Sequence, residues 1–397
     1  MVGRCIRAWL LAATASAAGC ADPVDSEATF DWVTEGTEFV QSAAVRRAVL
    51  EGSLVEPGNG YGRLRLENYA TDGGWDALPE WNPPVTPVLV ADVQRGGRLE
   101  VDALRLRPMD VPDAALLTDA QLLALGEAAF FGYPVQSAPL ASQWLQAPDG
   151  GASSGLEADV FGRVGGLVAV QQADGSVAPW MTCATCHGDV VQGVRVAGRT
   201  NERMLGGRVD VTADGVDNPQ AIVDLRPVSL QTHLHAAGTV VNGPAELAVR
   251  VDTLITTSLG QRQRAPRLIA WALARYLWSL EQTLPPVQPA VGSAGRQVFD
   301  RECSACHSVE GRSVEPVAME LVGTDEAAGR SSERGTGSWR VPSLRGVSLR
   351  SQYLHTANFR SLDAMFAPDR DPDVGHTFGL ALPFDERTAL LVFLQGL

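Results

Sequence analysis

Apolar residues recur at helical spacing in two long segments before the last quarter of the chain. Over about residues 266–281 they lie at i, i+4, i+7, i+8 and i+11, which is one buried face of a helix; they are Ile269, Leu273, Tyr276, Leu277 and Leu280. An earlier helix is predicted from Thr118, which forms a capping box with Gln121, to Gly132 and Pro134. That helix contains Gly126 and, four residues later, Phe130.

The last hundred residues predict two more helices. The first holds the pair Gly295 and Phe299, at the same spacing as the earlier glycine and phenylalanine. The second ends the chain, and its apolar positions again share one face; they are Leu390, Phe393, Leu394 and Leu397. Pro285, Pro286 and Pro289 precede this pair of helices, so residues 284–290 are predicted to be a Pro-rich linker.

Residues 31–117 show less regular patterning. Apolar runs at 87–90 and 99–101 flank Gly96 and Gly97, which predicts a β-hairpin. Trp75 and Trp81 lie in an irregular stretch and are expected to be core residues. We interpret 31–117 as an accessory segment, containing some β structure, that packs on the region after it.

Composition and charge narrow the function classes. A chain of 397 residues is too long for one small core and predicts two or three domains. The net charge is -14, and the sequence contains arginine but no lysine. Nucleic acid is therefore excluded as an expected partner, because phosphate binding needs a basic face. An acidic surface could attract a basic redox protein, or serve solubility alone.

The N-terminus predicts export. Residues 1–19 carry two arginines followed by an apolar run too short to span a bilayer, as in a signal peptide. Residues 17–20 (AAGC) resemble the lipobox of bacterial lipoproteins, so Cys20 is the expected lipidation site. Residues 20–30 would then be a lipid-anchored tether, and the protein would face the periplasm or outer envelope, held to the membrane by that anchor alone.

The two remaining pairs of cysteines form CxxCH motifs, Cys183–His187 and Cys303–His307. Two cysteines one helical turn apart can bond the two vinyl groups of one porphyrin, and the next histidine then binds its iron. Zinc is the rival interpretation of a CxxC pair, but a histidine follows directly in both copies. We therefore expect two covalent haem c groups, attached through Cys183, Cys186, Cys303 and Cys306, with His187 and His307 as proximal ligands.

The distal ligands decide between electron transfer and an open, reactive iron. For the second haem the candidates are His376, which has glycines on both sides (Gly375 and Gly379), Met365 and His355; we favour His376. For the first haem they are His235, His233 and Met204, or no protein ligand. His233 and His235 would share a face if that segment were a strand.

The order of helix, CxxCH motif, loops and final helix is that of a class I cytochrome c. We therefore predict a mainly α fold with two tandem class I cytochrome c-like haem domains, 118–283 and 291–397, behind the accessory segment. A weak internal repeat agrees with duplication: residues 228–235 resemble 347–355, with one extra residue in the second copy.

Residues 118–397 resemble the bacterial di-haem cytochrome c peroxidase family, which includes the methylamine-utilisation di-haem enzyme and, distantly, the rubber oxygenases. The resemblance rests on both CxxCH motifs, residues 125–131, the run 341–347 leading to 353–355, Gly375-His376 and the final helix. It implies a reactive first haem and an electron-entry second haem. The segment after the first motif, residues 198–204, lacks the histidine of the peroxidase pattern, and Glu202 is the nearest carboxylate there.

We therefore expect electron transfer with a redox protein partner, and reduction of hydrogen peroxide at the first haem as the alternative. A gas sensor is a third possibility. Residues Asp210, Thr212, Asp214 and Gly215 resemble the start of a calcium loop, but Ala221 stands at its twelfth position, where calcium loops have glutamate. An Asp-Gly turn is the alternative. Trp271, Tyr276 and Trp278 could relay electrons between haems, or simply fill the core.

Overall fold

The computed structural model describes residues 30–149, 151–209, 218–288 and 292–397. Its contacts divide the chain into Met1–Asp31 and Trp32–Leu397, and the elements below belong to the second unit. The signal peptide, Cys20 and the calcium-like loop from Asp210 lie outside the described residues. Among the helices that are described, none combines the length and apolar character needed to span a bilayer.

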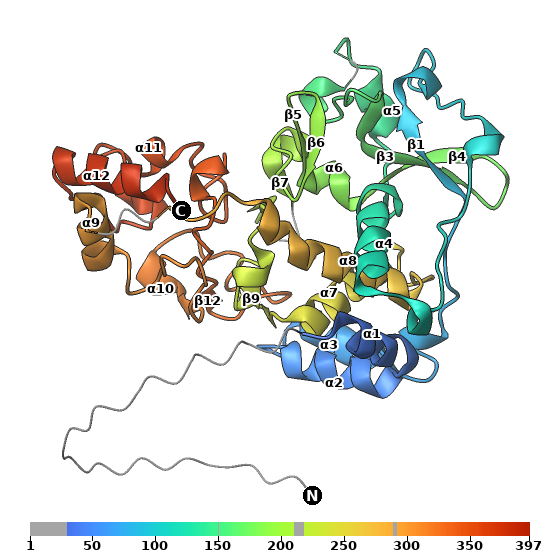
Figure 1. The fold of residues 1–397 in the computed structure, drawn as a ribbon, viewed down its shortest axis with the longest axis horizontal. Coiled ribbons are helices and arrows are strands. Elements are labelled where there is room, and N and C mark those ends of the chain that lie inside the picture. Colours follow the sequence, from blue (N-terminus) through green and yellow to red (C-terminus); the bar gives the residue numbers. More distant parts are fainter. Residues whose placement is uncertain (1–29, 150, 210–217, 289–291) are drawn as a thin grey trace, which may run out of the picture. The chain divides into compact units, whose positions relative to one another are not determined.

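The predicted helices of the first haem region are present and pack together. α4 (Asp119–Gly132) begins with the capping box of Thr118 and Gln121. α8 (Arg267–Ser279) is buried on nearly all sides over its first eight residues, which is more than the single face its apolar spacing predicts. α8 lies against both α4 and α7 (Pro244–Ser258) (Figure 1).

The C-terminal region repeats this crossing with α9 (Ala294–Glu302) and α12 (Phe384–Leu394), which lie side by side in Figure 1. A Cβ added to Gly126 would collide with the Ala272 carbonyl and the Tyr276 side chain. A Cβ added to Gly295 would collide with the equivalent atoms of Ala389 and Phe393. Both glycines therefore permit close contact between two helix backbones.

The accessory segment contains three helices that the apolar pattern did not predict. They are α1 (Trp32–Gln41), α2 (Ala43–Ser53) and α3 (Gly60–Asn68). α1 packs on α8 and α2 on α7. Trp271 of α8 lies 4.9 Å from the ring of Phe39 and donates a hydrogen bond to the Trp32 carbonyl. Trp271 is therefore a core residue that joins the accessory helices to α8.

The hairpin predicted around Gly96 and Gly97 is confirmed in part. The two glycines form a turn with positive φ, Val93 and Leu99 are bridged across it, and the Glu100 amide donates to the Asp92 carbonyl over 2.9 Å. The run 87–90 is not an arm of this turn, because β1 (Val85–Leu89) pairs with β3 (Arg163–Gln171), in a sheet of order β1-β3-β4-β2. Leu99 and Val101 still pack against the core cluster that contains the fully buried Val88. The other strands of this sheet are β4 (Val177–Met181) and β2 (Gln136–Ser137).

Short elements complete the two haem regions. The first contains the short helices α5 (Ala141–Leu145) and α6 (Cys183–His187) and three pairs of strands. β5 (Gly188–Val191) pairs with β6 (Val194–Ala197), β7 (Arg208–Val209) with β8 (Gln220–Ala221), and β9 (His233–Leu234) with β10 (Val240–Val241). The second contains β11 (Val317–Ala318) paired with β12 (Ser338–Trp339), α10 (Met319–Val322) and α11 (Leu362–Met365).

The internal repeat has a different register from the one its sequence predicts. Val228–Leu230 and Val347–Leu349 are both single 3₁₀ turns. Leu234 then pairs with Val240, as Tyr353 pairs with Phe359. His235 and Leu354 share a φ of 64°, and Gly238 and Ala357 have φ of 59° and 55°. The two copies therefore match without an inserted residue, and His235 corresponds to Leu354, not to His355.

Candidate haem-binding sites

The first CxxCH motif forms α6, which packs against β3. The hydroxyls of Thr182 and Thr185 both donate to the Gly166 carbonyl, over 2.8 and 2.9 Å. Gly166 has a φ of +71°, and a Cβ there would lie 2.6 Å from the Thr185 nitrogen. The glycine therefore lets the strand backbone approach the motif and fix the position of both cysteines.

His187 has one ring nitrogen committed to the protein. Its Nδ1 lies 3.0 Å from the Val223 carbonyl oxygen. Because a carbonyl can only accept, Nδ1 carries the proton and Nε2 keeps its lone pair. Burial lowers the pKa of His187 to about 4. The imidazole is therefore neutral at pH 7, in the tautomer that a metal-binding histidine with a backbone hydrogen bond adopts.

His307 has the same arrangement. It hydrogen-bonds to the Pro342 carbonyl, and burial, with a smaller contribution from His376, lowers its pKa to about 4. Val223 and Pro342 occupy equivalent positions in the ungapped repeat described above. Pro342, the acceptor for His307, lies in the run 341–347 that the sequence analysis had singled out. Val223, the acceptor for His187, lies in no motif and could not be predicted.

The four motif cysteines are free thiols in the structure. Burial raises the pKa of Cys183 to about 12 and the pKa values of Cys186 and Cys303 to about 11. All three are therefore protonated at neutral pH. Neutral thiols beside neutral imidazoles fit the donor set of a covalently attached haem, in which each sulfur becomes a thioether and only histidine binds the iron.

The loop that carries His376 is held from two sides. The His376 amide donates to the Val322 carbonyl of α10 over 2.6 Å. The Arg370 guanidinium donates to the carbonyls of Gly375 and His376, over 2.9 and 2.6 Å. A Cβ on Gly375 would clash with the Gly323 backbone, so glycine is required for this approach. Arg370 is a supporting residue that the sequence pattern did not reveal.

His376 and His307 lie near each other. After burial, the electrostatic effect of His376 is the largest influence on the pKa of His307, and it lowers that pKa. Burial likewise lowers the pKa of His376, so this ring is also neutral at pH 7. The structure thus brings the predicted distal histidine of the second site close to the proximal one.

The rival ligands of the second site have other surroundings. Met365 is 8% exposed and packs in the C-terminal core with Leu362 and Phe366. His355 stacks on Trp339 with ring centroids 4.1 Å apart. Burial lowers the pKa of His355, and a hydrogen bond to the Asp325 backbone opposes that shift. His355 also lines a small cavity with Arg208 and Asp325.

The three candidates for the first site have different surroundings. Met204 is fully buried in a core cluster with Leu156 and Leu167, and Cys186 of the first motif packs against that cluster. His233 is on β9, with Nδ1 3.2 Å from the Thr232 hydroxyl. His235 lies beyond the strand, and its Nε2 accepts a hydrogen bond from Arg250 over 2.6 Å. The two histidines therefore do not share a strand face, and His235 keeps only Nδ1 without a partner.

Glu202, the carboxylate nearest in sequence to a possible acid-base role, lies at the surface. Its side chain is 36% exposed and forms an ion pair with Arg360 at 3.8 Å. The residues with which the pKa of His187 is coupled are Val223 and Asp224. Glu202 is therefore not placed to act as an acid-base group at the first site.

Comparison with known proteins identifies part of the chain. A search of curated proteins found no match. The solved structures that resemble it include a hydrazine synthase from Kuenenia stuttgartiensis (17% identity, TM-score 0.37, 79% of this chain and 100% of that one). They also include a MauG-like protein associated with microbial copper homeostasis (16%, 0.39, 81% and 94%) and the diheme peroxidase BthA from Burkholderia thailandensis (17%, 0.32, 80% and 87%). The family model for cytochrome c matches residues 292–397, so this region, with its Cys303–His307 motif, is a cytochrome c domain.

Proposed function

We propose that the protein is an exported di-haem c-type cytochrome that transfers electrons. The second haem would be held by Cys303 and Cys306, with His307 and His376 as its two axial ligands. The contacts that carry this proposal are those of the His376 loop. Arg370 and the Val322 carbonyl hold its backbone, and the histidine lies close enough to His307 to lower the pKa of that residue. An attached haem supplies an iron that alternates between the ferric and ferrous states.

Residues around the second haem would hold its two histidine ligands in place during electron transfer. The Pro342 carbonyl fixes the tautomer of His307, and Arg370 holds the backbone of the opposite ligand. If His307 and His376 both held the iron, neither oxygen nor peroxide would have a place to bind. Little would then have to move when the charge of the iron changed, which suits an electron carrier.

We extend the proposal to the first region, 118–283, as a second class I-like haem domain with Cys183, Cys186 and His187. Two parallels support this. The proximal histidines both bond to carbonyls at equivalent positions of the repeat. Gly126 and Gly295 meet the same pair of positions on the last helix of their region. A duplicated haem domain, as in the di-haem cytochrome c peroxidase family, would produce both.

The cellular setting is also a proposal. Haem c is attached outside the cytoplasm, so a signal peptide at 1–19 and lipidation of Cys20 fit the cofactor. The anchor would hold the protein at a periplasmic or outer-envelope membrane, where a redox protein of unknown identity would exchange electrons with it. Calcium at the loop from Asp210 remains a weaker proposal, because the expected glutamate is missing.

The experiment that tests the second site compares His376→Ala with His355→Ala. Electron paramagnetic resonance of the purified ferric protein should show a low-spin signal from the second haem. We expect His376→Ala to convert that signal to high spin, because one axial ligand is lost. His355→Ala, a buried histidine of the same domain, should leave it unchanged. A low-spin signal that survives His376→Ala would overturn the assignment.

One observation favours peroxide reduction at the first haem as a second candidate. The His235 Nε2 accepts a hydrogen bond from Arg250, and the His233 Nδ1 lies 3.2 Å from the Thr232 hydroxyl, so both rings have other contacts. If Met204 also stayed in its core cluster, the far side of a haem on His187 would lack a protein ligand. In that case the first haem should be high-spin and its spectrum should change when peroxide is added. Two low-spin haems unaffected by peroxide would contradict this candidate.

A further inference from the structure

Three arginines surround one tyrosine where the accessory segment meets the rest of the unit. Tyr61 and Arg65 belong to α3, Arg250 to α7, and Arg334 to the loop before β12. The guanidinium carbons lie 3.4 Å (Arg65), 5.9 Å (Arg250) and 5.4 Å (Arg334) from the centre of the tyrosine ring. We call these three arginines, together with Arg340, the arginine cluster.

His235 ties Arg340 to the other three. Its ring packs edge-on against Tyr61, with centroids 5.2 Å apart, and accepts the hydrogen bond from Arg250. The Arg340 amide donates to the carbonyl of Ala236, the next residue, over 2.8 Å. After burial, the charges of all four arginines lower the pKa of His235, which is the residue that Arg340 shares with the three arginines around Tyr61.

The cluster has no adequate counter-charge of its own. Among the described residues, no carboxylate forms an ion pair with any of the four arginines. Glu333 acts electrostatically on Arg334, and no carboxylate is among the groups that act on Arg65 or Arg340. Burial lowers the pKa of Arg65 and Arg340 to about 10 and that of Arg334 to about 9, so all remain charged at pH 7.

Several donors in the cluster also lack acceptors. Arg250 Nη1, Arg340 Nε and His235 Nδ1 are buried without a hydrogen-bond partner. Buried donors without partners destabilise the fold, and unpaired buried charges do so more strongly. Guanidinium groups that converge in this way match the geometry of carboxylates and other oxyanions.

We propose that the arginine cluster is a binding site for an oxygen-bearing anion. Two sources have this chemistry. One is a propionate of an attached haem, since Arg340 lies two residues before Pro342, the carbonyl that orients His307. The other is a free small oxyanion. The first source rests on the proposed function, and the second does not.

The direction in which the melting temperature changes when an arginine of the cluster is replaced tests whether an anion is bound there. Arg334→Gln and Arg340→Gln each remove one charge, and neither side chain donates a hydrogen bond to the protein in the structure. If an anion is bound, the melting temperature of the haem-loaded protein should fall by roughly 3 °C or more. If the four charges stand alone, removing one relieves repulsion, and the melting temperature should stay or rise, which would overturn the proposal.

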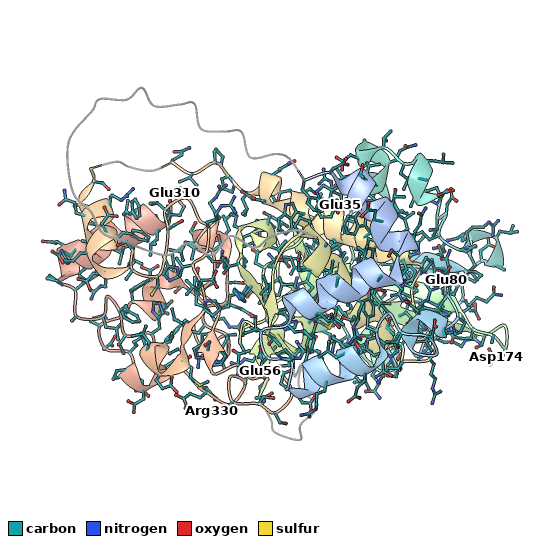
Figure 2. The ribbon with its side chains drawn as sticks, turned by 90° about the horizontal axis from the view of Figure 1, so that it is seen from below. Glu35, Glu56, Glu80, Asp174, Glu310 and Arg330 are labelled. Atoms are coloured by element: carbon teal, nitrogen blue, oxygen red, sulfur yellow. The ribbon has the colours of Figure 1, made fainter. Side chains whose placement is uncertain are left out.

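Arg330→Gln is the matched control. Arg330 lies four residues from Arg334, at the edge of the molecule (Figure 2), and its side chain is 59% exposed with ion pairs to Glu320 and Glu326. Exposed pairs contribute little, so this variant should melt within about 1 °C of the parent.

Sulfate and resonance Raman spectra separate the two sources. With a free anion, added sulfate should raise the melting temperature of the parent protein and have less effect on Arg334→Gln. With a propionate, sulfate should have no effect, while the propionate bending bands should shift in Arg340→Gln and not in Arg330→Gln. A protein that shows neither response has no such site. Haem content, measured by absorption and mass, shows independently whether the haem proposal has failed.

Discussion

The histidines of the chain differ in what their ring nitrogens contact, and this separates ligand candidates from structural residues. His187 and His307 each bond to a carbonyl through one nitrogen and keep the other available. His376 sits near His307 on an anchored loop. His235 gives its Nε2 to Arg250, a contact in which the nitrogen is an acceptor and the ring must be neutral. Sequence spacing alone could not distinguish these cases.

The neutrality of His235 predicts a pH dependence of stability. Burial and four arginines hold its pKa well below the ordinary value of about 6.5. Below pH 6.5 the unfolded chain binds a proton at this residue that the folded protein does not. The stabilising contribution is therefore complete above pH 6.5 and is lost as the pH falls, by about 1.4 kcal/mol between pH 7.5 and 5.5.

Denaturant titrations at these two pH values measure the effect. His235→Gln retains an acceptor for Arg250 but cannot bind a proton, so its free energy of unfolding should fall by about 1.4 kcal/mol less over the interval than that of the parent. Other groups titrate equally in both proteins and cancel in the comparison. Equal losses would mean that His235 is protonated in the fold.

At the scale of elements, long helices with a clear apolar period could be predicted, and so could their caps. α4, α8, α9 and α12 all lie where the sequence indicates them. The sheet could not be predicted, because β1 finds its partner more than seventy residues away and both its faces are influenced by tertiary contacts. The short helices α1 to α3 were missed, since their apolar residues are few and separated by charged ones.

The close crossing of α9 and α12 predicts that one added methyl group lowers the free energy of unfolding. Gly295→Ala should destabilise the protein by about 1–3 kcal/mol, because the new Cβ has no room against the Ala389 carbonyl. Gly52→Ala is the matched control. Gly52 lies within α2, and nothing lies within 4 Å of the Cβ it would gain.

Alanine at Gly52 should stabilise the protein by about 0.5–1 kcal/mol through helix propensity and reduced freedom of the unfolded chain. Differential scanning calorimetry compares the two variants with the parent. If Gly295→Ala behaved like Gly52→Ala, α9 and α12 would not cross in contact at that residue.

At the scale of the molecule, the CxxCH motifs identified the cofactor chemistry, but the role of the accessory segment was visible only in three dimensions. The segment was expected to pack on the region after it, but the contacts that would hold it there could not be predicted. Arg46, Asp76 and Tyr69 from the segment join Asp252 of α7 and Arg267 of α8 in one buried network. Such a network links charges almost two hundred residues apart, and sequence patterning contains no signal for partners at that distance.

This network predicts that the accessory helices and the first haem region unfold together. Asp252 is fully buried, accepts the Tyr69 hydroxyl over 2.7 Å and pairs with Arg267. Asp252→Asn leaves the Arg267 charge with Asp76 as its remaining partner and should cost about 3–5 kcal/mol. Glu51→Gln, which breaks the exposed pair with Arg47, should cost less than about 1 kcal/mol.

Calorimetry with haem absorbance as a second probe should show one coincident transition that moves to lower temperature in Asp252→Asn. If haem absorbance instead changed at the parent's temperature while part of the heat uptake moved, the accessory segment would be folding independently of the haem region.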